Sequence, residues 1–450
     1  MDFFDFSANL TNNWKKNYDD FAQDESLNIS EEKITEVFSK LQKKLENNYP
    51  FFHPFYAGQM LKPPHFSSVG AYLATMILNP NNHALDGGPA TAELEKECIK
   101  KLADMFGFEK YLGHLSSSGT IANLEALWIS REINPLKYIV YSEQSHYTHS
   151  RMCNLLNVKH FSIKSDNLGK MDINDLEKKL IEFEIGTIVV TLGTTGLGAL
   201  DPLEDILELQ KKYNFRIHID SAYGGFYTVL KDSNLINGKA FSLISKCDSV
   251  VIDPHKHGLQ PYGCGCVIFS DPEIGKFYSH DSPYTYFTSD ELHLGEISLE
   301  CSRAGASASA FWATLELFPL EENNGFGNIL KKTRLAGIKF AEKIKKSDNF
   351  TLLLEPELDI VCYYPNIESK KVSEISDLTE KMFSYAEKNE KLFLAKIKIT
   401  KSLANNKNLI WDQDNLIIFR SCFMKPEHLE YIETIFEKIN SSYLNTMKEI

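Results

Sequence analysis

Lys256 lies in a bend between two apolar runs of the sequence. The segment Asp253–Gly258 that carries it follows the β-branched run Ser249–Ile252 and precedes the glycine-bearing run Pro261–Phe269. This pattern is typical of two buried strands on either side of a turn punctuated by Pro and Gly. A lysine in a partly desolvated bend has a lowered pKa and a nucleophilic amine, which suits it to Schiff-base chemistry. For any single lysine, a solvated surface position is the alternative.

An acid 36 residues earlier supplies a chemical partner for this lysine. The alternating pattern Arg216–Asp220 would deliver Asp220 to the carboxyl end of a strand, and Gly224-Gly225 behind it would let backbone or ligand approach closely. A carboxylate at this position can keep a pyridine nitrogen protonated. Lys256 and Asp220 are therefore the pair that a pyridoxal 5′-phosphate (PLP) enzyme requires, a lysine for the Schiff base and an acid that makes the ring an electron sink.

These motifs resemble the group II PLP-dependent amino-acid decarboxylases, the family of glutamate, aromatic-amino-acid, tyrosine and aspartate decarboxylases. The resemblance extends from about Pro54 to about Pro426 and is densest between Pro89 and Arg303. It implies the PLP-dependent transferase fold (fold type I), PLP as cofactor, conversion of an L-amino acid to the amine and CO₂, and a homodimer with shared active sites. Another PLP-dependent reaction, by a carbon–carbon lyase or an aminotransferase, stays open, as does a catalytically silent scaffold.

The segment Leu115–Leu124 is a small-residue loop that enters a helix. The free amides and hydroxyls at such a helix start can bind a phosphate, although a loop of this kind is most often only an N-cap. The resemblance makes Gly119 and Thr120 the first choices for contacts to the cofactor phosphate, with Ser118 next. His255, directly before the lysine, is a further phosphate or backbone contact in the family.

Two residues are expected on the faces of the cofactor ring. His146 follows the apolar run Tyr138–Tyr141; in the family this histidine stacks on one face of the ring, and Ala222 would cover the other. A satisfied loop histidine, or a metal ligand together with His149, is the alternative for His146. We expect no metal site, because the other close histidines flank Lys256 and complete no zinc-like set.

Three further residues are candidates for contacts to cofactor or substrate. Thr194 lies in Thr191–Pro202, which matches the family's Gly-Thr-Thr…Gly-Ala…Asp-Pro pattern; a threonine bonded to its own backbone is an equal alternative. Arg420 interrupts an apolar strand pattern, and the family pairs an arginine here with the substrate α-carboxylate, whereas an exposed edge strand is the other explanation. His65, in a stretch rich in Pro and aromatic residues, is a candidate for the substrate mouth.

The segment Asp281–Asp290 is polar and aromatic with few apolar anchors, a composition that predicts a mobile lid. The family carries on this lid a tyrosine that returns a proton to the substrate carbon after CO₂ leaves, a general-acid role. Tyr286 fits that position slightly better than Tyr284, and spacing alone does not separate the two.

Short apolar strands alternate with helical patterns between residues 138 and 252. This predicts an α/β domain with a mostly parallel sheet, of the seven-stranded type that the resemblance implies, and with ligands at the carboxyl ends of the strands. We expect a helical N-terminal arm over 1–60, a large PLP-binding domain over 61–322 and a smaller C-terminal α+β domain over 323–450. The helical spacing of apolar residues between Ile34 and Leu45 predicts a helix that packs on its own subunit or clasps a second one.

The composition argues against several classes of partner. A net charge of −13 without a long basic run disfavours nucleic acid and anionic membranes, which need a clustered positive surface. The eight cysteines are scattered without a Cys-x-x-Cys motif, which indicates neither a disulfide framework nor a zinc ribbon. The N-terminus is acidic where a signal peptide would be basic, and no apolar run approaches the roughly 20 residues of a membrane helix. We therefore expect a cytoplasmic protein without nucleic-acid or membrane partners.

Overall fold

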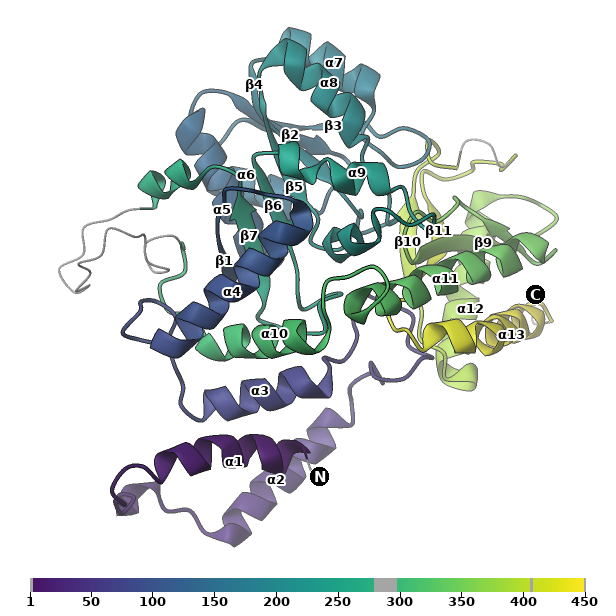
Figure 1. Cartoon of the computed structure of the whole chain (residues 1–450). Helices are drawn as coiled ribbons and strands as arrows, with labels where there is room; N and C mark the ends of the chain where they lie inside the picture. Colours follow the sequence, from purple (N-terminus) through teal and green to yellow (C-terminus); the bar gives the residue numbers. More distant parts are fainter. Residues whose placement is uncertain (1–2, 279–297, 405–407, 449–450) are drawn as a thin grey trace.

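The computed structural model of the chain describes residues 3–278, 298–404 and 408–448, and it contains two sheets (Figure 1). The strands of the larger sheet are β1 (Leu112–Ser116), β2 (Tyr138–Ser142), β3 (His160–Ile163), β4 (Ile185–Thr191), β5 (Arg216–Asp220), β6 (Ser249–Ile252) and β7 (Gly265–Phe269). Their order is β1-β7-β6-β5-β4-β2-β3. The strands from β6 to β3 pair in parallel, whereas β7 is antiparallel to both β6 and β1. The predicted mostly parallel sheet is thereby confirmed.

Helices cover both faces of this sheet, which explains why its strands are continuous apolar runs. Val250 and Ile252 of β6 pack in the same core cluster as Leu102, whereas Val251 between them packs with Ala122 in another cluster. The helices are α4 (Pro89–Phe106), α5 (Gly119–Ile133), α6 (Thr148–Leu155), α7 (Ile173–Glu182), α8 (Leu203–Tyr213), α9 (Gly238–Ser242) and α10 (Gly305–Leu317).

A second, four-stranded sheet forms the C-terminal part of the chain, as predicted for an α+β domain. Its strands β8 (Phe350–Leu352), β9 (Ile360–Pro365), β10 (Ala395–Ile399) and β11 (Leu416–Cys422) lie in the antiparallel order β10-β11-β9-β8. The helices α11 (Gly325–Lys346), α12 (Val372–Tyr385) and α13 (His428–Met447) accompany it (Figure 1). Stacked rings of Tyr363 and Phe419, 5.4 Å apart, lie in its core with Phe340. The exact domain borders remain a prediction.

Three α-helices precede α4 in the described part of the chain: α1 (Phe3–Lys15), α2 (Glu31–Leu45) and α3 (Phe66–Met76). The ring of Phe3 lies 5.1 Å from that of Phe66, and Thr11 donates a hydrogen bond to the Ala74 carbonyl, so α1 is fixed on α3. By contrast, α2 contains no buried residue, and Figure 1 shows it at the periphery beside α1. No helix in the described part of the chain is long and apolar enough to cross a membrane.

Candidate active site

A cavity of about 270 Å³ lies where strands of the large sheet end and α5 begins. The carboxyl ends of parallel strands are the expected place for a ligand. Of the residues singled out from the sequence, those that line this cavity are Ser118, Gly119, Thr120, His146, Asp220, Ala222, His255 and Lys256. A larger cavity of about 770 Å³ lies in the small domain beside α12 and α13, but none of these residues lines it.

Asp220, the last residue of β5, is 6% exposed and is held by two hydrogen bonds. Its Oδ2 atom lies 2.8 Å from Nε2 of the buried His149, and its Oδ1 atom accepts a hydrogen bond from the Ala222 N–H at 3.1 Å. Burial raises the pKa of Asp220, but the hydrogen bond and charge of His149, with the charge of Lys256, outweigh burial and hold the pKa well below its ordinary value. Asp220 is therefore ionised at neutral pH and can keep a ring nitrogen protonated.

Lys256 lines the cavity with its ammonium group beside Asp253. The Nζ atom is 3.0 Å from Asp253 Oδ2, and the Lys256 N–H donates to the Asp253 carbonyl at 2.9 Å, which closes a turn after β6. Asp253 is 3% exposed, and its Oδ1 atom has no hydrogen-bond partner among the described residues. Sequence reasoning did not select Asp253 as a site residue. Its only signal was its position three residues before the lysine, the span of one tight turn.

The loop before α5 approaches the cavity with its backbone. Ser118 caps the helix, because its Oγ accepts a hydrogen bond from the Ile121 N–H at 3.3 Å. A Cβ atom at Gly119 would lie 2.6 Å from both carboxylate oxygens of Asp253, and a Cβ at Gly265 would lie 2.4 Å from the Ser118 carbonyl carbon. Both positions therefore require glycine, because neighbouring atoms approach the backbone too closely for a side chain. The first two amides of α5, those of Gly119 and Thr120, have no partner within the helix and can bind an anion.

Two histidines complete the walls of the cavity. Nδ1 of His146 is 2.8 Å from Thr148 Oγ1, and burial lowers the pKa of His146, which leaves its ring neutral at neutral pH. Nδ1 of His255 is 2.8 Å from the Cys264 carbonyl, and its ring centroid is 4.7 Å from that of Tyr262. His149 does not join His146 in a metal site but binds Asp220, and the described residues contain no group of three or more His, Cys, Asp or Glu suited to a metal ion.

The residues present fit PLP. A buried, ionised acid suits the ring nitrogen, a lysine suits the aldehyde, and the free amides at the start of α5 suit the phosphate. The orphaned Oδ1 atom of Asp253 also leaves a buried polar atom for a bound group in the same cavity. These groups come from three separate stretches of chain that the sheet brings to one place.

The structure places Thr194 outside the lining of the cavity. Thr194 is fully buried, and its Oγ1 accepts a hydrogen bond from the Ala199 N–H at 3.0 Å. This is the backbone-bonded alternative that the sequence left open. The neighbouring Thr191 and Thr195 line the cavity instead.

The remaining candidates do not line this cavity or lie outside the described residues. His65 caps α3, and its Nδ1 atom accepts a hydrogen bond from the Ser67 N–H at 3.3 Å. Arg420 is buried on β11 of the small domain and does not line the cavity. Tyr284 and Tyr286 lie outside the described residues.

Comparison with known proteins identifies the family. The family model described as the pyridoxal-dependent decarboxylase conserved domain matches residues 17–365. The chain is 29% identical over 343 residues to the L-aspartate/L-glutamate decarboxylase of Pyrococcus horikoshii, which covers 75% of this chain and 85% of that protein. It is 26% identical over 463 aligned positions to the L-tyrosine decarboxylase of Enterococcus faecium, with 78% and 75% of the two chains covered.

A solved structure agrees with these sequence matches. The crystal structure of mouse CSAD matches the fold with a TM-score of 0.80 at 19% identity, and the match covers 95% of this chain and 91% of that one. The two-sheet architecture is thus the PLP-dependent transferase fold, fold type I. The chain therefore belongs to the pyridoxal-dependent decarboxylases, carboxy-lyases that use PLP as their cofactor.

Proposed function

We propose that this protein converts an L-amino acid to the corresponding amine and CO₂, with Lys256 as the residue that holds PLP. The observation that carries the proposal is that Lys256 and the ionised, buried Asp220 line one cavity. Bound PLP supplies an electron sink for the electron pair that remains when the α-carboxylate leaves as CO₂. The chain's own residues bind and orient the reactants and exchange protons with the substrate.

The residues of the cavity would then have separate tasks. Asp220 keeps the proton on the ring nitrogen of the cofactor. The neutral His146 and the small Ala222 would hold the ring between them, since a larger side chain at position 222 would fill that space. The amides of Gly119 and Thr120 hold the phosphate at the start of α5.

We assign the α-carboxylate of the substrate to Arg420. Its side chain is 5% exposed, and its contacts among the described residues include no carboxylate. Its Nη1 atom is 3.4 Å from Gln59 Oε1, its Nη2 atom is 3.3 Å from Cys422 Sγ, and its Nε atom has no hydrogen-bond partner in the part of the chain that the structure describes. Burial of a guanidinium group without an anion is costly, which supports an anionic ligand at this position. The planar fork of arginine suits bidentate binding of a carboxylate.

We also propose a homodimer with shared active sites. On α2, the apolar residues Ile34, Val37, Phe38, Leu41 and Leu45 are all at least 45% exposed. A contiguous apolar face of this kind marks an interaction surface, and a second copy of the chain would bury it. Light scattering should report twice the mass of one chain, and Phe38→Glu should lower that mass whereas the surface variant Lys40→Glu should not. A fully active monomer would refute the proposal.

We place the protein in the cytoplasm, because all eight cysteines are free and seven of them are buried. Fractionation of cells that produce the protein tests this location. The substrate is to be sought among L-aspartate, L-glutamate and L-tyrosine first, since the relatives' names include these amino acids. A screen for CO₂ release from each amino acid tests the reaction itself; a keto acid formed without CO₂ would favour the aminotransferase alternative.

Lys256→Ala tests the central assignment. This variant should fold, should show no borohydride-reducible absorbance with added PLP and should release no CO₂. Lys239→Ala, at a lysine whose side chain is 62% exposed in the same domain, should behave as the parent protein. Substantial residual decarboxylation by Lys256→Ala would contradict the proposal.

A further inference from the structure

The strand β1 lies at the open edge of the large sheet. It pairs with β7 on one side, and no described strand pairs with it on the other. An edge strand of this kind presents unpaired backbone N–H and C=O groups at alternate residues. The edge is important here because β1 leads directly into the segment 117–120, which lines the proposed cofactor cavity.

An ion pair occupies this edge at Leu115. The Leu115 N–H donates to Glu95 Oε1 at 2.8 Å, and the Leu115 carbonyl accepts a hydrogen bond from Arg303 Nη1 at 2.5 Å. The same Nη1 atom lies 2.5 Å from Glu95 Oε1. Both side chains are buried, at 1% and 7% exposure, so the pair is shielded from solvent. The pair thus makes the two hydrogen bonds that a neighbouring strand would make.

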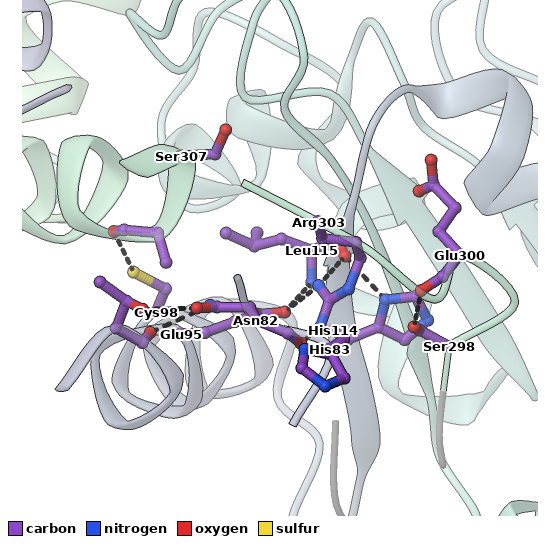
Figure 2. A network of polar contacts seen from close by, with 12 residues as sticks. Asn82, His83, Glu95, Cys98, His114, Leu115, Ser298, Glu300, Arg303 and Ser307 are labelled. Carbon is purple, nitrogen blue, oxygen red and sulfur yellow. Dashed lines mark hydrogen bonds and ion pairs between the residues drawn. The ribbon is translucent and has the colours of Figure 1, made fainter. Parts of the chain in front are cut away.

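Asn82 holds this ion pair in place from the other side. Its side-chain amide donates to Glu95 Oε2 at 2.6 Å, and its backbone carbonyl accepts a hydrogen bond from Arg303 Nη2 at 3.0 Å (Figure 2). The Asn82 N–H in turn donates to the Arg303 carbonyl at 2.9 Å. A pair with this many fixed contacts has little freedom to move, so it can position the backbone that it binds.

Glu300 binds the same edge of the chain two residues beyond Leu115, at Ser117. Its Oε2 atom accepts a hydrogen bond from the Ser117 N–H at 2.7 Å, and Ser298 Oγ donates to the Glu300 carbonyl at 2.7 Å. Residues that differ by two in an extended chain present their backbone groups at the same edge. Ser117 is itself part of the cavity lining, next to the helix start at Ser118.

We infer that Glu95, Arg303 and Glu300 are positioning residues for cofactor binding. Their side chains replace the missing strand at the edge of β1 and fix the loop before α5 in the shape that receives the PLP phosphate. This inference rests on the proposed function, because it takes the amides of Gly119 and Thr120 as the phosphate site. A loop that is ordered before the ligand arrives binds it more tightly, since less conformational entropy is lost on binding.

Glu300→Ala in the full-length, cofactor-free protein is the sharpest test, because Glu300 is the least buried of the three. We expect the Kd for PLP to rise about tenfold or more and the Ser117 N–H to exchange faster with solvent. Glu300→Gln keeps an oxygen for that N–H and should stay within about threefold of the parent Kd. Glu93→Gln, at a 61% exposed residue of α4, is the matched control and should bind PLP like the parent.

Urea unfolding of the same samples separates positioning from general stability. Affinity for PLP that is unchanged in Glu300→Ala would overturn the inference. The inference would also be overturned if Glu300→Gln did not rescue the affinity for PLP and if the loss of affinity followed an equal loss in the free energy of unfolding. The proposed function is tested separately by the parent protein. If the parent forms no borohydride-reducible adduct at Lys256, the proposed function fails together with this inference. If the parent forms the adduct, the results for the Glu300 variants concern the positioning residues alone.

Discussion

The Nε2 atom of His149 lies 2.8 Å from Oδ2 of Asp220, and both side chains are buried. The acid that faces the cofactor cavity is therefore bound by a second buried group that does not line the cavity itself. His149 lowers the pKa of Asp220 against the effect of burial. The ionised state of Asp220 consequently depends on a residue outside the cavity lining.

Substitution of His149 by Phe should weaken catalysis through Asp220. The phenyl ring of the variant would take the place of the imidazole ring, but the hydrogen bond to the Asp220 carboxylate would be lost. Burial would then raise the pKa of Asp220. A hydrogen bond to a charged group of this kind corresponds to roughly a tenfold to hundredfold effect on kcat/KM. Because a carboxylate with a raised pKa is protonated at higher pH, the acid limb of the pH profile of kcat/KM should also move to higher pH.

His160→Asn is the matched control for this experiment. His160 is a histidine on β3 that contacts Tyr141 and Asn154, not Asp220. Its variant should keep the parental pH profile. An unshifted acid limb in His149→Phe would mean that Asp220 is kept ionised by other groups.

Gly119→Ala should lower the affinity for PLP by about tenfold to a hundredfold. The added methyl group would press on the Asp253 carboxylate, which a Cβ atom would meet at 2.6 Å. Alanine is favoured over glycine in helices, so any fall in the melting temperature of the cofactor-free protein should come from this steric contact and not from a loss of helix propensity. The double variant Gly119→Ala/Asp253→Ser should bind PLP no worse than Asp253→Ser alone, because the shorter side chain removes the contact. Additive losses would contradict the steric explanation.

The buried pair of His114 and Glu125 should make stability depend on pH. The two side chains are 2.7 Å apart, Tyr278 also donates to Glu125 Oε2 at 3.0 Å, and Arg303 lies nearby. Burial lowers the pKa of His114, but the charge and hydrogen bond of Glu125 outweigh burial and raise it above 6.5. A group whose pKa is higher in the folded than in the unfolded state stabilises the folded protein fully at any pH below its unfolded-state pKa. This contribution to stability is lost as the pH rises through its folded-state pKa.

We therefore expect His114→Gln to lower the free energy of unfolding by about 3 kcal/mol near pH 6. The difference from the parent should narrow above pH 6.5. Urea unfolding of the cofactor-free proteins at several pH values measures this difference. A difference that widens with pH would show that His114 is neutral in the folded protein.

The tyrosines at 284 and 286 lie outside the described residues, and their prediction depends on the family resemblance. Tyr286→Phe should leave substrate binding nearly unchanged but slow amine formation by about 10²–10⁴, the effect of a positioned general acid. Tyr284→Phe is its control. Diversion of substrate to an aldehyde or ketone should accompany the slower reaction. If both variants form amine at the parental rate, Lys256 or His146 must provide the proton.

The parts of the site that follow apolar runs were predictable from the sequence. Asp220 ends a buried strand, and His146 and Lys256 each come shortly after one; parallel strands bring their carboxyl ends together. The strands β1 and β3 gave no such signal, since Leu112–Ser116 contains a glycine and a histidine and His160–Ile163 is short. The histidine of β1 is buried because Glu125 neutralises its charge, a contact between distant residues that periodicity does not reveal.

The sequence could not show which of the neighbouring threonine hydroxyl groups faces the cavity, and the reason here is a different one. Gly193 adopts a φ of +101°, and a bridge between Leu192 and Leu200 folds the following loop back on itself. This turn directs the Thr194 hydroxyl to the Ala199 N–H and leaves Thr191 and Thr195 at the cavity. Sequence spacing gives the position of a threonine along a loop, but the direction of its side chain depends on backbone angles within that loop.

The side chains of Glu95, Arg303 and Glu300 also affect how this protein meets other protein chains. An unoccupied strand edge is a template on which a second chain can add a strand, and such addition begins aggregation. The backbone groups of Leu115 and the N–H of Ser117 are already bonded, and two carboxylates and a guanidinium lie along that edge. At Leu115 and Ser117 this edge of the large sheet therefore offers no free backbone group on which a second chain could begin to pair.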